Sequence, residues 1–351
     1  MSSPRPFELL PPGVVVNTMR GDAAEHRAPA WLDWDGTLEL DAALIGVPYD
    51  GASVVRTGSR HGPNAVRQAM MYFTTYSSRD RRSMVGLRAA DLGDVAVVMT
   101  DMERTFRAIS AAVRGLVERG IVPVVIGGDH SIAFPNIRGV VEALGPGKRI
   151  GIVHFDAHHD LRTAHLGAES SGVPFRKALE MPGRPLAGRN LVQIGLAEFH
   201  NSPQLDEYAA QMGVTVVSGL EVRERGIEAV VEQALSIATE GVDALYVSVD
   251  IDCINQAQAP GTAAPNPFGL DAREVQAALR RIGAHPKLAG ADIVEISPPF
   301  DPQNITGGTG ASLVLSLLYG LSLRVAAQAQ EPAQEPSQDQ SASAAAAIQA
   351  R

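Results

Sequence analysis

The feature that most constrains the fold is a series of short, nearly continuous apolar runs that alternate with segments of helical periodicity. Apolar runs of this kind are typical of strands buried on both faces, and helices between them are typical of parallel crossovers. The apolar runs lie at 41–50, 121–128, 149–155, 191–196, 214–218, 244–249 and 291–296. Helical segments begin near Asn64 and cover 101–120, 226–240, 271–282 and 310–324. We therefore predict a three-layer α/β/α domain with a predominantly parallel central sheet.

The length of 351 residues suits one large domain, which we place at 41–326 after an N-terminal extension at 1–40. Residues 327–351 are rich in Gln, Ala, Ser, Glu and Pro and poor in large apolar side chains. Such a composition cannot repay the entropy of ordering, so we expect a disordered low-complexity tail. The alternative is a helix at 341–351 that docks on a partner.

Charge and cysteine content limit the partners and the compartment. The net charge of −9 disfavours nucleic acid or an anionic membrane surface and leaves a small-molecule substrate as the better expectation. Cys253 is the single cysteine, so no internal disulfide can form, and a reducing cytoplasm is the default. An extracellular protein without disulfides remains open. The N-terminus lacks a basic region followed by a hydrophobic one, and we expect neither a signal peptide nor a membrane span.

One apolar run, IGIVHFDAHHD at 150–160, breaks into carboxylates and imidazoles. Buried aspartate is almost never left unpaired, so such a cluster needs a counter-charge, and a bound cation is the simplest one. Asp156, His158 and Asp160 alternate in sequence, which lets their side chains project toward one site.

Similar polar groups follow two other apolar runs, GGDH at 127–130 and SVDID at 248–252. Taken alone, the first could be a tight turn with a helix-capping Asp, and the second a solvated strand end. Parallel strands, however, place their carboxyl ends at one edge of the sheet, where the groups would meet. The combined donors are two imidazoles and four carboxylates: His130, Asp156, His158, Asp160, Asp250 and Asp252.

Six such ligands exceed what one ion usually takes from protein, whereas two ions about 3.5–4 Å apart can share bridging carboxylates. The absence of thiolates among them suits Mn²⁺ or a similar divalent ion. Two such ions lower the pKa of a shared water and stabilise a tetrahedral intermediate. The pattern therefore predicts a hydrolase.

These motifs, with APGT at 259–262 and VEISPPFD at 294–301, resemble those of the ureohydrolases, the arginase and agmatinase family. The likeness extends from about Ala43 to Leu323 and includes the opening stretch ALIGVPYDGASVVRTGSRHGPNAVRQA. It implies an arginase-like fold and hydrolysis of a C–N bond in a guanidino or formimino compound. It also implies two metal ions, Mn²⁺ or alternatively Ni²⁺, and a trimer or hexamer, with a homologous partner subunit as a further possibility.

The resemblance also assigns roles to residues. One metal ion would take His130, Asp156, Asp160 and Asp250, and the other Asp156, His158, Asp250 and Asp252. Asp156 and Asp250 would bridge the two ions and hold the hydroxide that attacks the amidine carbon. Glu295 falls where the family places a carboxylate near the substrate guanidinium, a role that bidentate hydrogen bonding suits. The alternative for Glu295 is a structural salt bridge.

Substrate identity is the open question. Three segments look more like those of formimidoylglutamases than those of arginases or agmatinases: DAHHDLR at 156–162, 170–176 and 259–270. Arg162 stands where arginases contact the substrate carboxylate, and it could hold a glutamate carboxylate or form a surface ion pair. Ser171, a further substrate-binding candidate, replaces the proton-shuttle histidine of many members, and serine cannot serve as an acid at neutral pH. His61, His159 and His165 are possible substitutes, each with a structural alternative.

The loop after SVDID departs from the family pattern at Asn255, Gln256 and GTAAP. These changes keep agmatine, guanidinobutyrate, guanidine and alkylguanidines or biguanides open as substrates. They also suggest a different class of function, a non-catalytic subunit that assembles with an active homologue. Retention of all six metal-ligand candidates argues against that class. Phosphoester hydrolysis is disfavoured because no Asn-His metal motif accompanies the carboxylates.

Overall fold

The computed structural model describes residues 5–14, 26–164 and 169–330. Its centre is an eight-stranded sheet in the order β4-β1-β5-β10-β9-β6-β7-β8, with every neighbouring pair parallel. The strands are β1 (Ala42–Gly46), β4 (Ala89–Asp94), β5 (Val122–Ile126), β6 (Ile150–Phe155), β7 (Leu186–Leu196), β8 (Thr215–Ser218), β9 (Ala244–Asp250) and β10 (Leu288–Val294). A short antiparallel hairpin is formed by β2 (Tyr76–Ser77) and β3 (Arg82–Ser83). The predicted parallel α/β sheet is confirmed.

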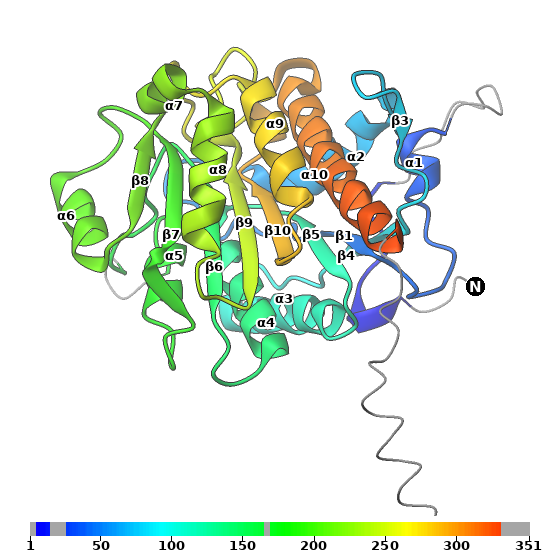
Figure 1. Cartoon of the computed structure of the whole chain (residues 1–351), viewed down its shortest axis with the longest axis horizontal. Helices are drawn as coiled ribbons and strands as arrows, with labels where there is room; N and C mark the ends of the chain where they lie inside the picture. The colour runs from blue at the N-terminus through cyan, green and yellow to red at the C-terminus, as the bar shows by residue number, and fades with distance from the viewer. Residues whose placement is uncertain (1–4, 15–25, 165–168, 331–351) are drawn as a thin grey trace, which may run out of the picture.

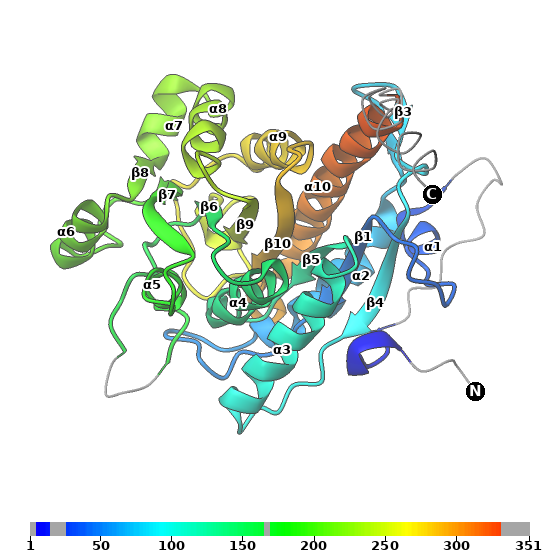
Figure 2. The ribbon, with the colours of Figure 1, turned by 60° about the horizontal axis from the view of Figure 1, so that its bottom comes forward.

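Helices cover both faces of the sheet (Figures 1 and 2). One face carries α2 (Gly62–Ala69), α7 (Gly219–Arg225), α8 (Ile227–Ala238), α9 (Ala272–Gly283) and α10 (Ile305–Gln330). The other carries α3 (Met102–Val117), α4 (Ala133–Leu144), α5 (Pro174–Leu179) and α6 (Pro203–Met212). A short α1 (Ala28–Trp31) lies beside the hairpin.

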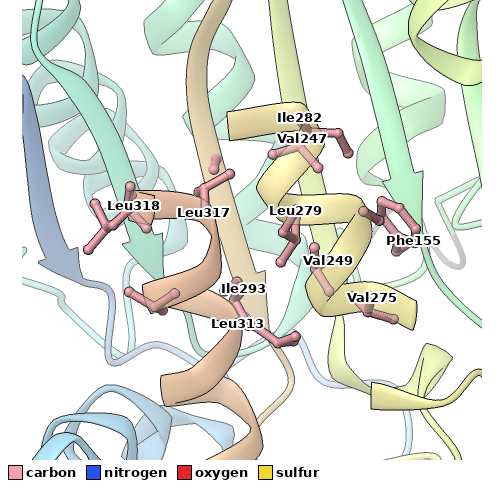
Figure 3. Packing of buried hydrophobic residues seen from close by; sticks show 14 of the residues in the cluster. Phe155, Val247, Val249, Val275, Leu279, Ile282, Ile293, Leu313, Leu317 and Leu318 are labelled. Carbon is pink, nitrogen blue, oxygen red and sulfur yellow. The ribbon is translucent and has the colours of Figure 1, made fainter. Parts of the chain in front are cut away.

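The core follows from strand alternation, because successive side chains of a strand point to opposite faces. Val247 and Val249 of β9 point toward α9 and α10, where they pack with Leu279 and Leu317 (Figure 3). Tyr246, the residue before Val247, belongs to the cluster on the other face. Both faces of the sheet are therefore buried under helices. This explains why the central strands are apolar at nearly every position and do not alternate with polar residues.

The sequence analysis missed several elements, and in two of them, β4 and α4, polar or helix-breaking residues interrupt the apolar pattern. Strand β4 contains Asp91 and Asp94, which are paired with the buried Arg67 of α2 at 2.7 and 2.6 Å. Its carboxylates serve an internal ion network, so the strand does not read as apolar. Helix α4 contains Pro135 and Gly139, both buried against neighbouring elements.

Helix α10 is longer than predicted at both ends and is, among the described residues, the one helix region with the length and apolarity of a membrane span. Most of that apolar surface is buried inside the domain, where α10 packs on α9 and α2. It is therefore a core helix. Residues 327–330 of the predicted tail continue α10, and residues 331–351, including the alternative docking helix, lie outside the described residues.

Candidate metal centre

Four neighbouring strands, β5, β10, β9 and β6, deliver the predicted site residues to one edge of the sheet. His130 lies in a 3₁₀ turn after β5, and the stretch 156–160 follows β6. Asp250 ends β9, Asp252 lies in the next 3₁₀ turn, and Glu295 follows β10. The sequence-distant clusters therefore meet at the carboxyl edge, as parallel topology requires.

The first candidate metal position lies at the Nδ1 atom of His130. Carboxylate oxygens of Asp160, Asp156 and Asp250 lie 2.9, 3.2 and 3.2 Å from this nitrogen. The nitrogen is buried and forms no hydrogen bond of acceptable geometry. On its far side, Nε2 of His130 lies 2.9 Å from the Ser248 hydroxyl. An orphaned imidazole nitrogen facing three carboxylates fits a divalent cation.

The second candidate position is centred on His158. Its Nδ1 atom lies 3.0 Å from Asp252 Oδ2 and 3.3 Å from Asp156 Oδ1. Asp156 thus faces both positions, one with each carboxylate oxygen, which is the arrangement a bridging ligand needs. Asp250 faces His130 with Oδ2, while its Oδ1 accepts a hydrogen bond from the Asp252 amide. Its role as a second bridge remains a prediction.

The electrostatics show an excess of buried negative charge. Burial, together with the charges of Asp252 and Asp156, raises the pKa of Asp250 well above its usual value. The pKa of Asp160 is raised to about 6, chiefly by burial and then by the charge of Asp156. Burial alone lowers the pKa of His158, but Asp252 and Asp156 outweigh it and raise the pKa to about 12. Each shift has the direction expected of a site built to hold cations.

His154 also approaches this cluster and is close enough to His130 and Asp156 to be considered a ligand. Both of its ring nitrogens are already engaged, since Nε2 lies 2.8 Å from Asp156 Oδ2 and Nδ1 accepts from Gln193 at 3.0 Å. Burial lowers its pKa to about 4, so the ring is neutral at neutral pH. We therefore treat His154 as an outer partner of Asp156. Sequence reasoning missed it, although a histidine within an apolar run was a usable signal.

A small cavity of about 70 Å³ opens over the candidate metal positions. Glu295 lines it; its Oε1 accepts the His130 amide at 2.9 Å, and its buried Oε2 has no hydrogen-bond partner among the described residues. The hydroxyl of Thr262, which also lines the cavity, is likewise buried without a partner. Two buried acceptors without partners, on residues that line one cavity, suit an N–H-rich ligand. Burial, followed by the charges of Asp250 and Asp129, raises the pKa of Glu295 well above its usual value.

Two of these site residues have backbone conformations that L-amino acids rarely adopt. Asp160 has φ of 51° and Glu295 has φ of 63°. For a non-glycine residue such a conformation costs about 1–2 kcal/mol. The strain is local to the residues that face the cavity.

The substrate-binding candidates lie at the mouth of the same cavity. Arg162 and Ser171 both line it, and the Arg162 side chain is exposed, with no ion pair found among the described residues. Ser171 fixes the loop before α2, because its amide donates to the Ala52 carbonyl and its hydroxyl accepts from the Val54 amide. The exposed Val54 and Val55 of that loop form an apolar rim.

Of the substitute proton shuttles, neither His61 nor His159 lines the cavity. His159 is buried, with its ring nitrogens 2.7 Å from Gln193 and 2.8 Å from Asp206. His61 lines a separate depression with Asn64 and Asp301. His165 lies outside the described residues. A histidine that the sequence reasoning did not consider, His200, lies beside His158, with ring centroids 5.4 Å apart.

Comparison with known proteins places this geometry in a family. A family model described as "Arginase family" matches residues 40–320 of this chain. The chain belongs to the arginase family. It is 36% identical over 293 residues to formimidoylglutamase of Halalkalibacterium halodurans, covering 83% of this chain and 90% of that protein. It is also 36% identical over 295 residues to guanidinopropionase of Pseudomonas aeruginosa, covering 83% and 89%.

The crystal structure of Bacillus subtilis formimidoylglutamase is similar, with a TM-score of 0.78 at 32% identity over 83% of this chain and 90% of that one. This arginase-family protein is therefore a metal-dependent hydrolase of amidine or guanidino C–N bonds. The predicted family, fold and enzyme class are confirmed.

Proposed function

We propose that this enzyme hydrolyses a small substrate that carries a formimino or guanidino group at one end and a carboxylate at the other. The observation that carries the proposal is a cavity whose lining includes both the buried Glu295 carboxylate and the exposed Arg162 side chain. The Glu295 carboxylate suits an amidinium, and the exposed Arg162 guanidinium suits a carboxylate through paired hydrogen bonds. Formimidoylglutamate has both groups, and a formimidoylglutamase is among the relatives.

Six residues would hold the two metal ions: His130, Asp156, His158, Asp160, Asp250 and Asp252. Oxygen and imidazole donors without a thiolate favour Mn²⁺, with Ni²⁺ as the alternative. When bound, the ions would lower the pKa of a shared water and stabilise negative charge in the transition state. The Ser248 hydroxyl, 2.9 Å from His130 Nε2, orients that ring toward the first position.

The remaining residues bind and orient the substrate. Glu295 would accept N–H groups of the amidine through Oε2, while Thr262 would accept a further one. Arg162 would hold the distal carboxylate at the cavity mouth. Ser171 would contribute by holding the Val54 loop in place, since its hydroxyl is already used there. With water as the second reactant, formimidoylglutamate would yield glutamate and formamide.

A guanidino acid is the second candidate substrate, because the two unsatisfied acceptors of Glu295 and Thr262 can each take an N–H group of a guanidinium. The guanidinopropionase relative supports this candidate. Its hydrolysis would release urea and the amino acid. Guanidine, agmatine, guanidinobutyrate and alkylguanidines or biguanides remain alternatives for the same machinery.

A substrate panel tests the proposal. Formamide, urea and ammonia release would be measured with Mn²⁺-loaded enzyme on formimidoylglutamate, guanidinopropionate, guanidinobutyrate, agmatine, guanidine and a biguanide. We expect the carboxylate-bearing compounds to be preferred, and Arg162→Ala to raise KM for them by about 10-fold or more while leaving agmatine turnover unchanged. Equal turnover of agmatine and the acids by the wild-type enzyme would refute the carboxylate role.

Assembly and compartment belong to the same proposal. We propose a homo-oligomer, a trimer or a hexamer, in the cytoplasm, with a homologous partner subunit as the alternative assembly. Light scattering coupled to size-exclusion chromatography of the purified chain measures the first point. A monomer that is fully active would contradict it.

A further inference from the structure

A buried chain of hydrogen bonds runs from Asp156 away from the candidate metal positions. His154, Gln193 and His159 form this chain, and each is at most 1% exposed. His154 and Gln193 are register partners on the adjacent strands β6 and β7. Neither Gln193 nor His159 is among the residues proposed to hold the metal ions or the substrate.

The amide of Gln193 fixes the direction of its own hydrogen bonds and, through His154, that of the bond to Asp156. Its oxygen can only accept, so the hydrogen bond of 2.7 Å with His159 Nδ1 is donated by the ring. Its nitrogen donates to the His159 carbonyl at 2.7 Å and to His154 Nδ1 at 3.0 Å. Because Nδ1 of His154 accepts, the proton of the neutral ring lies on Nε2, which is 2.8 Å from Asp156 Oδ2.

The far end of the chain is anchored at the protein surface. Nε2 of His159 lies 2.8 Å from Asp206, an exposed residue of α6, and the His159 amide donates to Asn201 at 3.1 Å. Asp156 is therefore held from two sides. His154 donates to its Oδ2, and the amide of His158 donates to its Oδ1 at 2.6 Å.

We infer that Gln193 and His159 are positioning residues that fix His154 as its Nε2–H tautomer and thereby orient Asp156 toward both metal positions. The inference rests on the proposed function, in which Asp156 is shared by the two ions. Outer partners of this kind orient the first ligands, and their loss typically costs about 10- to 100-fold in metal affinity. His159 thus acts on the metal centre without touching it.

Mn²⁺ binding to Gln193→Leu, measured by titration calorimetry on the full-length, metal-free chain, tests the inference. The leucine fills the same space but can neither accept from His159 nor donate to His154. We expect Mn²⁺ affinity to fall by about 10- to 100-fold. His159→Phe keeps the ring and removes both nitrogens, so it serves as a second variant if Gln193→Leu fails to fold. Gln193→Glu restores the acceptor but not the donor and should not restore affinity.

Asn190→Leu is the matched control, because Asn190 is a buried amide on the same strand. Its side chain donates to the carbonyls of Ile237 and Glu240, away from the metal centre. We expect this variant to lose stability in thermal unfolding and to bind Mn²⁺ as the wild type does. Folded Gln193→Leu and His159→Phe variants with wild-type affinity would overturn the positioning role alone. A wild-type chain that binds less than one Mn²⁺ would overturn the proposed metal centre as well.

Discussion

Glu295→Gln separates substrate binding from metal binding at this site. The substitution keeps the side-chain length, and its amide oxygen can still accept from the His130 amide, now at 2.9 Å from Oε1. The Oε2 position, buried and without a partner, becomes an NH₂ group that donates instead of accepting. A substrate N–H group would then face another donor in a site from which water is largely excluded.

The expected loss of kcat/KM follows from the single hydrogen bond between a substrate N–H group and Glu295 Oε2. A hydrogen bond to a charged group contributes about 1.5–3 kcal/mol, which corresponds to about 10- to 150-fold in kcat/KM. Burial and then the charge of Asp250 raise the pKa of Glu295 in the metal-free chain, and bound cations would oppose both by favouring the ionised acceptor. Steady-state kinetics with the preferred acid substrate, alongside metal content by mass spectrometry, measures both effects.

Glu274→Gln is the control, since it removes a carboxylate of the α9 capping box, where glutamine also functions. It should leave kcat/KM unchanged. Glu295→Gln should retain two ions per chain and lose turnover. Wild-type kcat/KM in Glu295→Gln would refute the substrate role, and loss of the metal ions would show that Glu295 belongs to the metal centre instead.

Three further predictions concern the metal, pH and the core. Asp250→Asn should abolish binding of at least one Mn²⁺ and reduce turnover at least about 100-fold, because it removes a charge that faces His130; calorimetry showing two ions bound would contradict this. The folded-state pKa of His154 is lowered from 6.5 to about 4, so metal-free protein should lose stability as pH falls from 6.5 to 4, by about 3 kcal/mol through this group. In urea unfolding, the His154→Gln variant should lose about 3 kcal/mol less stability than the wild type over the same pH range. A variant with the same pH dependence of stability as the wild type would count against a buried neutral ring. Leu279→Ala should lower the free energy of unfolding by about 2–5 kcal/mol, and a change below 1 kcal/mol in urea titrations would show that the α9 contact is not tightly packed.

The sequence revealed the site more completely than the fold around it. Polar residues at the ends of apolar runs mark functional positions because packing cannot explain them. With a parallel sheet, this pattern predicted that His130, Asp156 and Asp250 meet at the carboxyl edge of the strands. The same reliance on apolar pattern hid β4, where Asp91 and Asp94 are neutralised by Arg67. No local pattern could reveal such a pairing, since it depends on contacts between distant segments.

Gln193 shows a second limit of sequence reasoning. Within LVQIGL it is one polar residue in an apolar strand, which alone predicts nothing about its partners. Its importance comes from register, because β7 places it beside His154 of β6. Register between parallel strands is set by the whole sheet and is therefore absent from any single segment.

The positive φ angles of Asp160 and Glu295 have a consequence for laboratory evolution of this enzyme. Each residue would relax if replaced by glycine, and Glu295→Gly would also remove a buried carboxylate. A library selected only for thermal resistance in the absence of metal should therefore accumulate changes at these two positions and yield robust but inactive proteins. Selection for turnover must accompany selection for stability if both positions are to be retained.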